Sequence, residues 1–157
     1  DTFLFTSSVS NNVLYGDPWA AKPDVVSAAE RAQLHEHVAK LPQEYDTLIG
    51  ERGLALSGGQ RQRLNISRSL LLGTHILILD DSTSAVDAGT EKKIREALKE
   101  GAAERLTIII SHRVASLMHA DQIVYMEDGR ILEIGNHQEL IKQGGNYAQL
   151  YQLQTID

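Results

Sequence analysis

The most informative stretch of this sequence is Ile76-Leu77-Ile78-Leu79-Asp80-Asp81. Four consecutive aliphatic residues predict a short strand that is covered on both faces, as in a parallel sheet. The two carboxylates would then lie at the carboxyl edge of the sheet, where ligands of such folds bind. Asp80 suits Mg²⁺, which takes oxygen ligands, and Asp81 would orient a water molecule. The alternative is two solvated residues in a strand-to-loop turn.

A second apolar run, Leu106–Ile110, predicts another buried strand that ends at Ser111-His112. His112 is therefore expected at the same sheet edge as the two carboxylates. A neutral imidazole there would hydrogen-bond a phosphate or a water molecule. The alternative is a structural histidine whose hydrogen bonds are satisfied within the fold.

Upstream of the first strand, Leu56-Ser57-Gly58-Gly59-Gln60 predicts the start of a helix that runs through Leu72 and is ended by Gly73. The unpaired N–H groups and the dipole of a helix start favour an anion, and Ser57 adds a hydroxyl. The site therefore suits a phosphate. The alternative is a serine-capped helix whose glycines allow close packing.

The remaining pattern alternates helices and strands, which predicts an α/β fold with a largely parallel sheet and a mostly helical region before residue 73. Tyr45–Leu56 is interpreted as irregular. The other expected elements are a short helix near residues 7–14, a helix over Val25–Lys40 capped by Asp24, a helix from Asp87 to about Glu100, a hairpin of residues 123–126 and 130–134 about Asp128-Gly129, a helix capped by Asn136 and Glu139 and ending at Gln143, and a last helix over residues 146–154.

Composition excludes several classes of protein. The 157 residues carry 15 Lys+Arg against 21 Asp+Glu and no Cys, so disulfides, thiolate metal sites and a basic nucleic-acid surface are not expected. Without an apolar run of about 18 residues, the chain is expected to be soluble. His35-Glu36-His37 places its imidazoles on different helix faces, which argues against a metal site. The arginines at positions 61, 63 and 68 could form a phosphate or RNA patch, but they are interpreted as a solvated helix face with some interface pairing.

With these motifs in this order, the chain resembles the nucleotide-binding domain of exporter-type ATP-binding-cassette (ABC) transporters. Leu56-Ser57-Gly58-Gly59-Gln60 resembles the family's signature motif, Ile76–Asp80 its Walker B strand and Ser84-Ala85-Val86-Asp87 its D-loop. His112 matches the switch histidine. Thr47–Gly53 is similar to the loop that contacts the transmembrane domains.

The resemblance implies a partial P-loop NTPase fold. Its parts would be a helical subdomain with the signature motif, residues 1–73, and the C-terminal part of a RecA-like core, residues 74–157. No Gly-x-x-x-x-Gly-Lys-Ser/Thr loop occurs, so the parallel sheet is expected to be incomplete and to lack the Walker A strand. Unpaired edges would follow, and we expect the chain to aggregate, rearrange or be completed by another chain.

Asp81 stands where the family usually has a catalytic glutamate. One fewer methylene withdraws the carboxylate by roughly 1–1.5 Å, which resembles the degenerate half of heterodimeric exporters. The alternative is an aspartate that works slowly in a homodimer. The resemblance further implies ATP and Mg²⁺ as cofactors, with Asp80 at the metal, Asp81 and His112 in catalysis and the signature residues binding ATP in trans.

The implied partners are a second nucleotide-binding domain and the transmembrane domains, at the cytoplasmic face of a membrane, with no nucleic acid. The leading hypothesis is a fragment of a domain that couples ATP hydrolysis to export. The first alternative is an interaction or assembly fragment without enzymatic activity, because the phosphate loop is absent. A soluble ABC ATPase of DNA repair or translation is the second alternative, and the acidic charge disfavours it.

Overall fold

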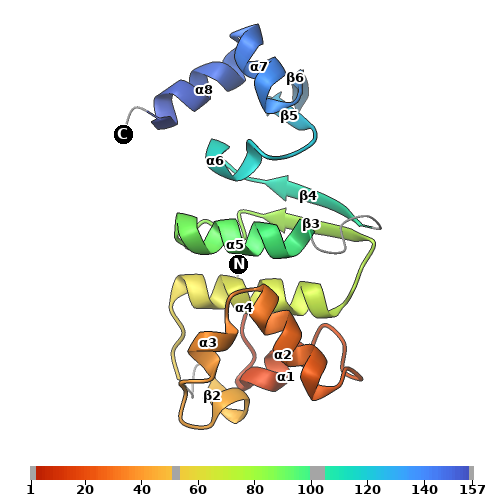
Figure 1. Cartoon of the computed structure of the whole chain (residues 1–157), viewed down its shortest axis with the longest axis vertical. Helices are drawn as coiled ribbons and strands as arrows, with labels where there is room; N and C mark the ends of the chain where they lie inside the picture. The colour runs from red at the N-terminus through yellow and green to blue at the C-terminus, as the bar shows by residue number, and fades with distance from the viewer. Residues whose placement is uncertain (1–2, 51–53, 100–104, 156–157) are drawn as a thin grey trace. The chain divides into compact units, whose positions relative to one another are not determined.

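The computed structural model describes residues 3–50, 54–99 and 105–155, in two compact units, residues 1–108 and 109–157. The elements, as labelled in Figure 1, are β1 (Ser7–Ser8), α1 (Val9–Leu14), α2 (Lys22–Arg31), α3 (His35–Val38), the 3₁₀ helix η1 (Glu44–Asp46), β2 (Leu48–Ile49), α4 (Gly58–Leu71), β3 (Ile76–Asp80), α5 (Ala88–Lys99), β4 (Leu106–Ile110), α6 (Val114–Leu117), β5 (Ile123–Glu127), β6 (Arg130–Gly135), α7 (His137–Gln143) and α8 (Asn146–Thr155).

The first part of the chain is mostly helical, as predicted. Helices α1 and α2 both pack against α4, and together they enclose an apolar core (Figure 1). The largest fully buried side chains of this core include Leu34, Ile49 and Leu64. The helix that carries the signature-like motif is therefore anchored along its length by residues of this chain.

The predicted single helix over Val25–Lys40 is wrong, because the structure has two shorter helices, α2 and α3. The helix begins earlier because the Asp24 carboxylate lies inside its first turn and accepts a hydrogen bond from the Ala21 main-chain N, at 3.1 Å. It ends earlier because Gln33 adopts a left-handed conformation with φ +57°. The turn there directs Leu34 into the core, and hydrophobic burial outweighs helix continuation.

Tyr45–Leu56 is also more regular than expected. It contains η1 and the two-residue strand β2, which pairs antiparallel with β1 in the register Ser7 to Ile49 and Ser8 to Leu48. Ile49 is fully buried in the helical core, which gives this short pair its support. Residues 51–53 of the loop lie outside the described residues.

Strands β3 and β4 form at the two predicted apolar runs and pair with each other. They are parallel, since Leu106 N bonds to His75 O at 2.8 Å and the two arrows point the same way in Figure 1. The expectation that β3 is covered on both faces is wrong: Leu77 is 4% exposed but Ile78 is 59% exposed. In β4, Leu106, Ile108 and Ile110 are likewise exposed. The described residues of this chain cover only one face of the pair.

The second unit contains the predicted hairpin of β5 and β6, which turns through Asp128 and Gly129, both with positive φ. Asn136 and Glu139 form the predicted capping box at the start of α7. A small core of Val114, Ile123, Leu140 and Tyr147 supports these elements. The expectation of a largely parallel sheet is corrected here, because β1–β2 and β5–β6 are both antiparallel.

None of the helices within the described ranges combines the length and the apolar content needed to span a bilayer. The contact-based units divide within β4, between residues 108 and 109. The division at residue 73 rests on family resemblance and stays a prediction.

Candidate functional site

The start of α4 has the geometry that the sequence predicts. Ser57 is the N-cap, and its hydroxyl accepts from Gln60 N at 3.3 Å while Gln60 Oε1 accepts from Ser57 N at 2.8 Å. Leu56 is buried and anchors the entry to the helix. Gly58 and Gly59 follow the cap, and the N–H groups of such first-turn residues have no acceptor within the helix. This end of α4 can therefore donate hydrogen bonds to an anion.

The two glycines of this motif differ in the room that the structure leaves for a side chain. A Cβ on Gly59 would lie 2.7 Å from the Ala85 carbonyl oxygen, whereas one on Gly58 would lie 3.5 Å from Ala85 Cβ, an ordinary contact. Gly59 thus permits the helix to approach the backbone of the turn after β3. The predicted close-packing role applies to Gly59, and it coexists with the anion-binding geometry.

The residues that follow β3 form a turn that leads into α5. Asp80 is the last residue of the strand, and Asp81 has a left-handed backbone with φ +44°, which aspartate tolerates better than most residues. Ser84 N donates to Asp81 O at 3.1 Å, and Val86, buried, donates to Thr83 O at 3.0 Å. Both carboxylate-bearing residues are exposed.

Asp87 caps α5, the helix that the sequence predicts to begin at this residue. Its Oδ1 accepts from Thr90 N at 2.9 Å, and the hydrogen bonds from Thr90 lower the pKa of the Asp87 carboxyl. A carboxylate at a helix start is also favoured by the helix dipole. Contact of Asp87 with a partner subunit, which the resemblance of Ser84-Ala85-Val86-Asp87 to a D-loop implies, stays a prediction.

Sequence reasoning missed Gln62, which joins the two regions. Its side chain bonds to Ser84 Oγ, to Ala85 N and to Asp81 O across the gap between α4 and the turn. Gln62 follows Gly58 by four residues on the helix, so the two share a face. That spacing was the one signal in the sequence, since Gly58 belongs to the motif that meets the turn.

Gln60 has a second contact that the sequence did not indicate. Its Nε2 lies 3.3 Å from His37 Nδ1 on α3. Burial, followed by the charges of Arg63 and Lys40, lowers the pKa of His37, so the neutral ring is favoured. A neutral Nδ1 accepts a hydrogen bond from the Gln60 amide, which links α3 to the start of α4.

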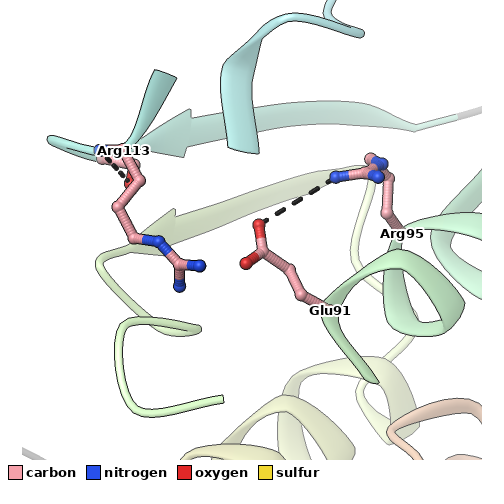
Figure 2. A network of polar contacts seen from close by, with 4 residues as sticks. Glu91, Arg95 and Arg113 are labelled. Carbon is pink, nitrogen blue, oxygen red and sulfur yellow. Dashed lines mark hydrogen bonds and ion pairs between the residues drawn. The ribbon is translucent and has the colours of Figure 1, made fainter. Parts of the chain in front are cut away.

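Helix α5 carries a buried carboxylate next to the turn. Glu91 and Arg95 point toward one another from successive turns of α5, with 3.9 Å between Glu91 Oε1 and Arg95 Nη1 (Figure 2). An i,i+4 pair of this kind supports a helix by about 0.2–0.5 kcal/mol. Among the described residues, no group of three or more His, Cys, Asp or Glu side chains could hold a metal ion. A bound Mg²⁺ would therefore need oxygen ligands beyond Asp80, which phosphates and water normally supply.

His112 belongs to the second unit, two residues after β4. It is exposed, and its main-chain oxygen accepts from Gln154 Nε2 at 2.7 Å. Gln154 Oε1 also accepts from Val114 N at 2.8 Å, so α8 fixes the backbone on both sides of this segment. The predicted approach of His112 to Asp80 and Asp81 stays a prediction.

Comparison with known proteins identifies the family. The profile of the ABC transporter family matches residues 1–84. An uncharacterized ABC transporter ATP-binding protein of Bacillus subtilis, YknU, is 51% identical over 157 residues, covering 100% of this chain and 27% of the relative. A putative multidrug export ATP-binding/permease protein of Staphylococcus aureus is 47% identical over 156 residues, covering 99% of this chain and 27% of the relative.

A solved structure, that of a bacterial Atm1-family ABC exporter with ATP bound, matches with a TM-score of 0.92 and 39% identity, over 97% of this chain and 27% of that chain. The chain thus spans about a quarter of the length of the proteins it matches. The partial P-loop NTPase fold inferred from the sequence agrees with this match. On the profile match and the four motifs together, the chain belongs to the ABC transporter family.

Proposed function

We propose that this chain supplies the signature motif, the Walker B carboxylate and the D-loop of an exporter cassette, which in the complete protein couples ATP binding and hydrolysis to transport. The observation that carries the proposal is the Ser57-capped start of α4, with glycines at its first two positions. The export names of the relatives support the direction of transport.

The residues at the start of α4 fit a terminal phosphate. The N–H groups of Gly58 and Gly59 and the hydroxyl of Ser57 are hydrogen-bond donors, and the helix dipole adds a positive potential. Leu56 and Gln60 hold these donors in place through burial and the capping box. As the resemblance to the family implies, a second nucleotide-binding domain would present the triphosphate to this surface.

The residues at the end of β3 fit the metal and water of a second nucleotide. ATP-bound Mg²⁺ supplies charge neutralisation at the phosphates, and Asp80 would be its carboxylate ligand. Asp81 would hold the attacking water, with a shorter reach than the usual glutamate. His112 would hydrogen-bond the terminal phosphate, Ser84-Ala85-Val86-Asp87 would meet the partner domain, and Thr47–Gly53 would contact the transmembrane domains.

The test is ATP hydrolysis by the full-length protein that contains this chain, reconstituted in lipid vesicles. Asp81→Glu should increase turnover by up to about a hundredfold, because a displacement of about 1 Å costs on that order. Asp80→Asn, the matched control, should abolish turnover both in the wild-type protein and in the Asp81→Glu variant. No increase with Asp81→Glu would contradict the impaired-base assignment.

A second candidate is that the 157 residues by themselves act only as an assembly module, and the missing phosphate loop favours it. Titration of Mg-ATP into the purified chain should give no binding in the micromolar range. Micromolar binding by a monomer would contradict both this candidate and the trans assignment of the signature motif.

A further inference from the structure

Gln62 joins α4 to the turn after β3 through three side-chain hydrogen bonds. Its Nε2 donates to Ser84 Oγ at 2.8 Å and to Asp81 O at 3.3 Å, and its Oε1 accepts from Ala85 N at 2.9 Å. The three groups that bond to Gln62 lie 19 to 23 residues after it in the chain. These bonds are therefore tertiary, and local helix geometry does not require them.

The pattern of donors and acceptors selects an amide. The –NH₂ group donates twice and the carbonyl oxygen accepts once, so the orientation of the amide is fixed by its partners. A glutamate of the same shape could still accept from Ala85 N. It would place a carboxylate oxygen against the Asp81 carbonyl, where the structure has a donor. A methionine of similar volume would keep the packing and lose all three bonds.

The bond to Asp81 O bears on the proposed catalytic carboxylate. Asp81 has a left-handed backbone, and its carbonyl accepts from both Ser84 N and Gln62 Nε2. With the carbonyl held from two sides, rotation of this residue is restricted, and so is the direction in which its side chain leaves the backbone. Gln62 therefore acts on the carboxylate of Asp81 through the main chain.

The same region lies against the signature motif. Gly59 closely approaches the Ala85 carbonyl, and Gln62 bonds to Ala85 N, so both main-chain groups of Ala85 face α4. A shift of α4 when its start meets a phosphate would move Gln62, and with it the backbone of the turn.

We propose that Gln62 is a positioning residue that ties the helix of the signature motif to the backbone of Asp81 and of the Ser84-Ala85 turn. It thereby couples the phosphate surface at the start of α4 to the carboxylate at the end of β3. This inference rests on the proposed function for the catalytic role of Asp81, but the tie itself is independent of that role.

The experiment uses the full-length protein in lipid vesicles with Gln62→Met and Gln62→Glu, and with Arg61→Lys as the control on the same helix. We expect kcat per folded molecule to fall about tenfold in Gln62→Met and further in Gln62→Glu, while the KM for ATP stays within about twofold, because misplacement of a reacting group lowers the chemical step. A purely structural role would lower the yield of folded protein and leave kcat per folded molecule unchanged. An unchanged kcat would overturn the positioning role.

A second measurement does not depend on hydrolysis. Amide hydrogen exchange of the peptide that contains Ala85, recorded without nucleotide, should be about fivefold faster in Gln62→Met, the change that corresponds to the loss of one hydrogen bond of about 1 kcal/mol. Ser84→Ala combined with Gln62→Met should add little further effect. Unchanged exchange would overturn the proposed link between Gln62 and the turn. A wild-type protein that fails to hydrolyse ATP would contradict the proposed function, and the exchange result would still decide whether this link exists.

Discussion

The helical region around α4 and the strand pair β3–β4 are both rich in aliphatic residues but differ in how those residues are covered. The helices bury their apolar faces against one another, and Leu34, Ile49 and Leu64 are fully inaccessible. In β3 every second residue is buried and the alternate residues are exposed, and in β4 half-buried residues alternate with exposed ones. The helical region encloses its core, while the strand pair presents an exposed apolar face.

The difference indicates where each part of the proposed site obtains its rigidity. The start of α4 is fixed by packing and by a capping box, both internal to the chain. The turn at Asp81–Ala85 gains three further hydrogen bonds from the side chain of Gln62 on α4. The well-packed helix α4 thus holds the more exposed turn in place.

The largest effect is expected at Arg68, which anchors the first residues of the chain to α4. Its guanidinium donates to Phe3 O at 2.7 Å, to Asn12 O at 2.5 Å and to Asn12 Oδ1 at 2.6 Å, and lies 5.4 Å from the centre of the Phe5 ring. Arg68→Met should lower the free energy of unfolding by about 4 kcal/mol, because charged hydrogen bonds contribute about 1.5–3 kcal/mol each and the partners lose their donor.

Urea unfolding followed by circular dichroism measures this change. Arg68→Lys keeps the charge but not the fork of donors, so it should fall between the wild type and Arg68→Met. A loss below 1 kcal/mol for Arg68→Met would show that the helical region does not depend on this anchor.

The strand pair offers a direct test of the contrast in coverage. In the 157-residue chain, Leu77→Ala should cost about 3 kcal/mol, because it removes a buried side chain, while Ile78→Ala should change stability by no more than about 0.5 kcal/mol. In the full-length protein the cost of Ile78→Ala should rise toward that of Leu77→Ala. Thermal unfolding of the 157-residue chain and of the full-length protein measures these changes. Equal losses of stability for Leu77→Ala and Ile78→Ala in the 157-residue chain would contradict the exposed face of β3.

The contact between α4 and the turn predicts unequal tolerance at the two glycines. Gly59→Ala should destabilise the chain by about 2 kcal/mol, the usual cost of forcing a methyl group against fixed backbone. Gly58→Ala, the matched control, has room for its Cβ and should change the free energy of unfolding by less than about 0.5 kcal/mol. Equal effects of the two substitutions in urea unfolding would mean that the close approach at Ala85 is absent.

The smallest effect is expected at His37, whose pKa is lowered mainly by burial. Below the ordinary value of 6.5 the unfolded chain takes up this proton more readily than the folded one. Stability should therefore be fully present above that pH and decrease as the pH falls toward the lower folded pKa. Unfolding curves from about one unit above that value to about 1.5 units below it measure the change, and His37→Asn should flatten the pH dependence.

Much of the local structure could be predicted from the sequence. The cap at Ser57, the turn at Asp128-Gly129 and the capping box of Asn136 and Glu139 each form from residues a few positions apart, so their signals are local. The same holds for the identity of the motif residues. The break at Gln33 was not predictable, because the gain comes from burying Leu34 in a core that only the assembled helices create.

The sequence by itself determined the order of the motifs and the family of the chain. It also determined where α4, β3 and α7 end, because these features depend on residue type and short spacing. Only the tertiary structure decided that one face of β3 is exposed, that Gly59 abuts Ala85 and that Gln62 holds the backbone of Asp81. These contacts join residues about 20 or more positions apart, or depend on which surfaces remain uncovered. Packing between distant segments leaves no periodic trace in the sequence, and for that reason it had to be observed.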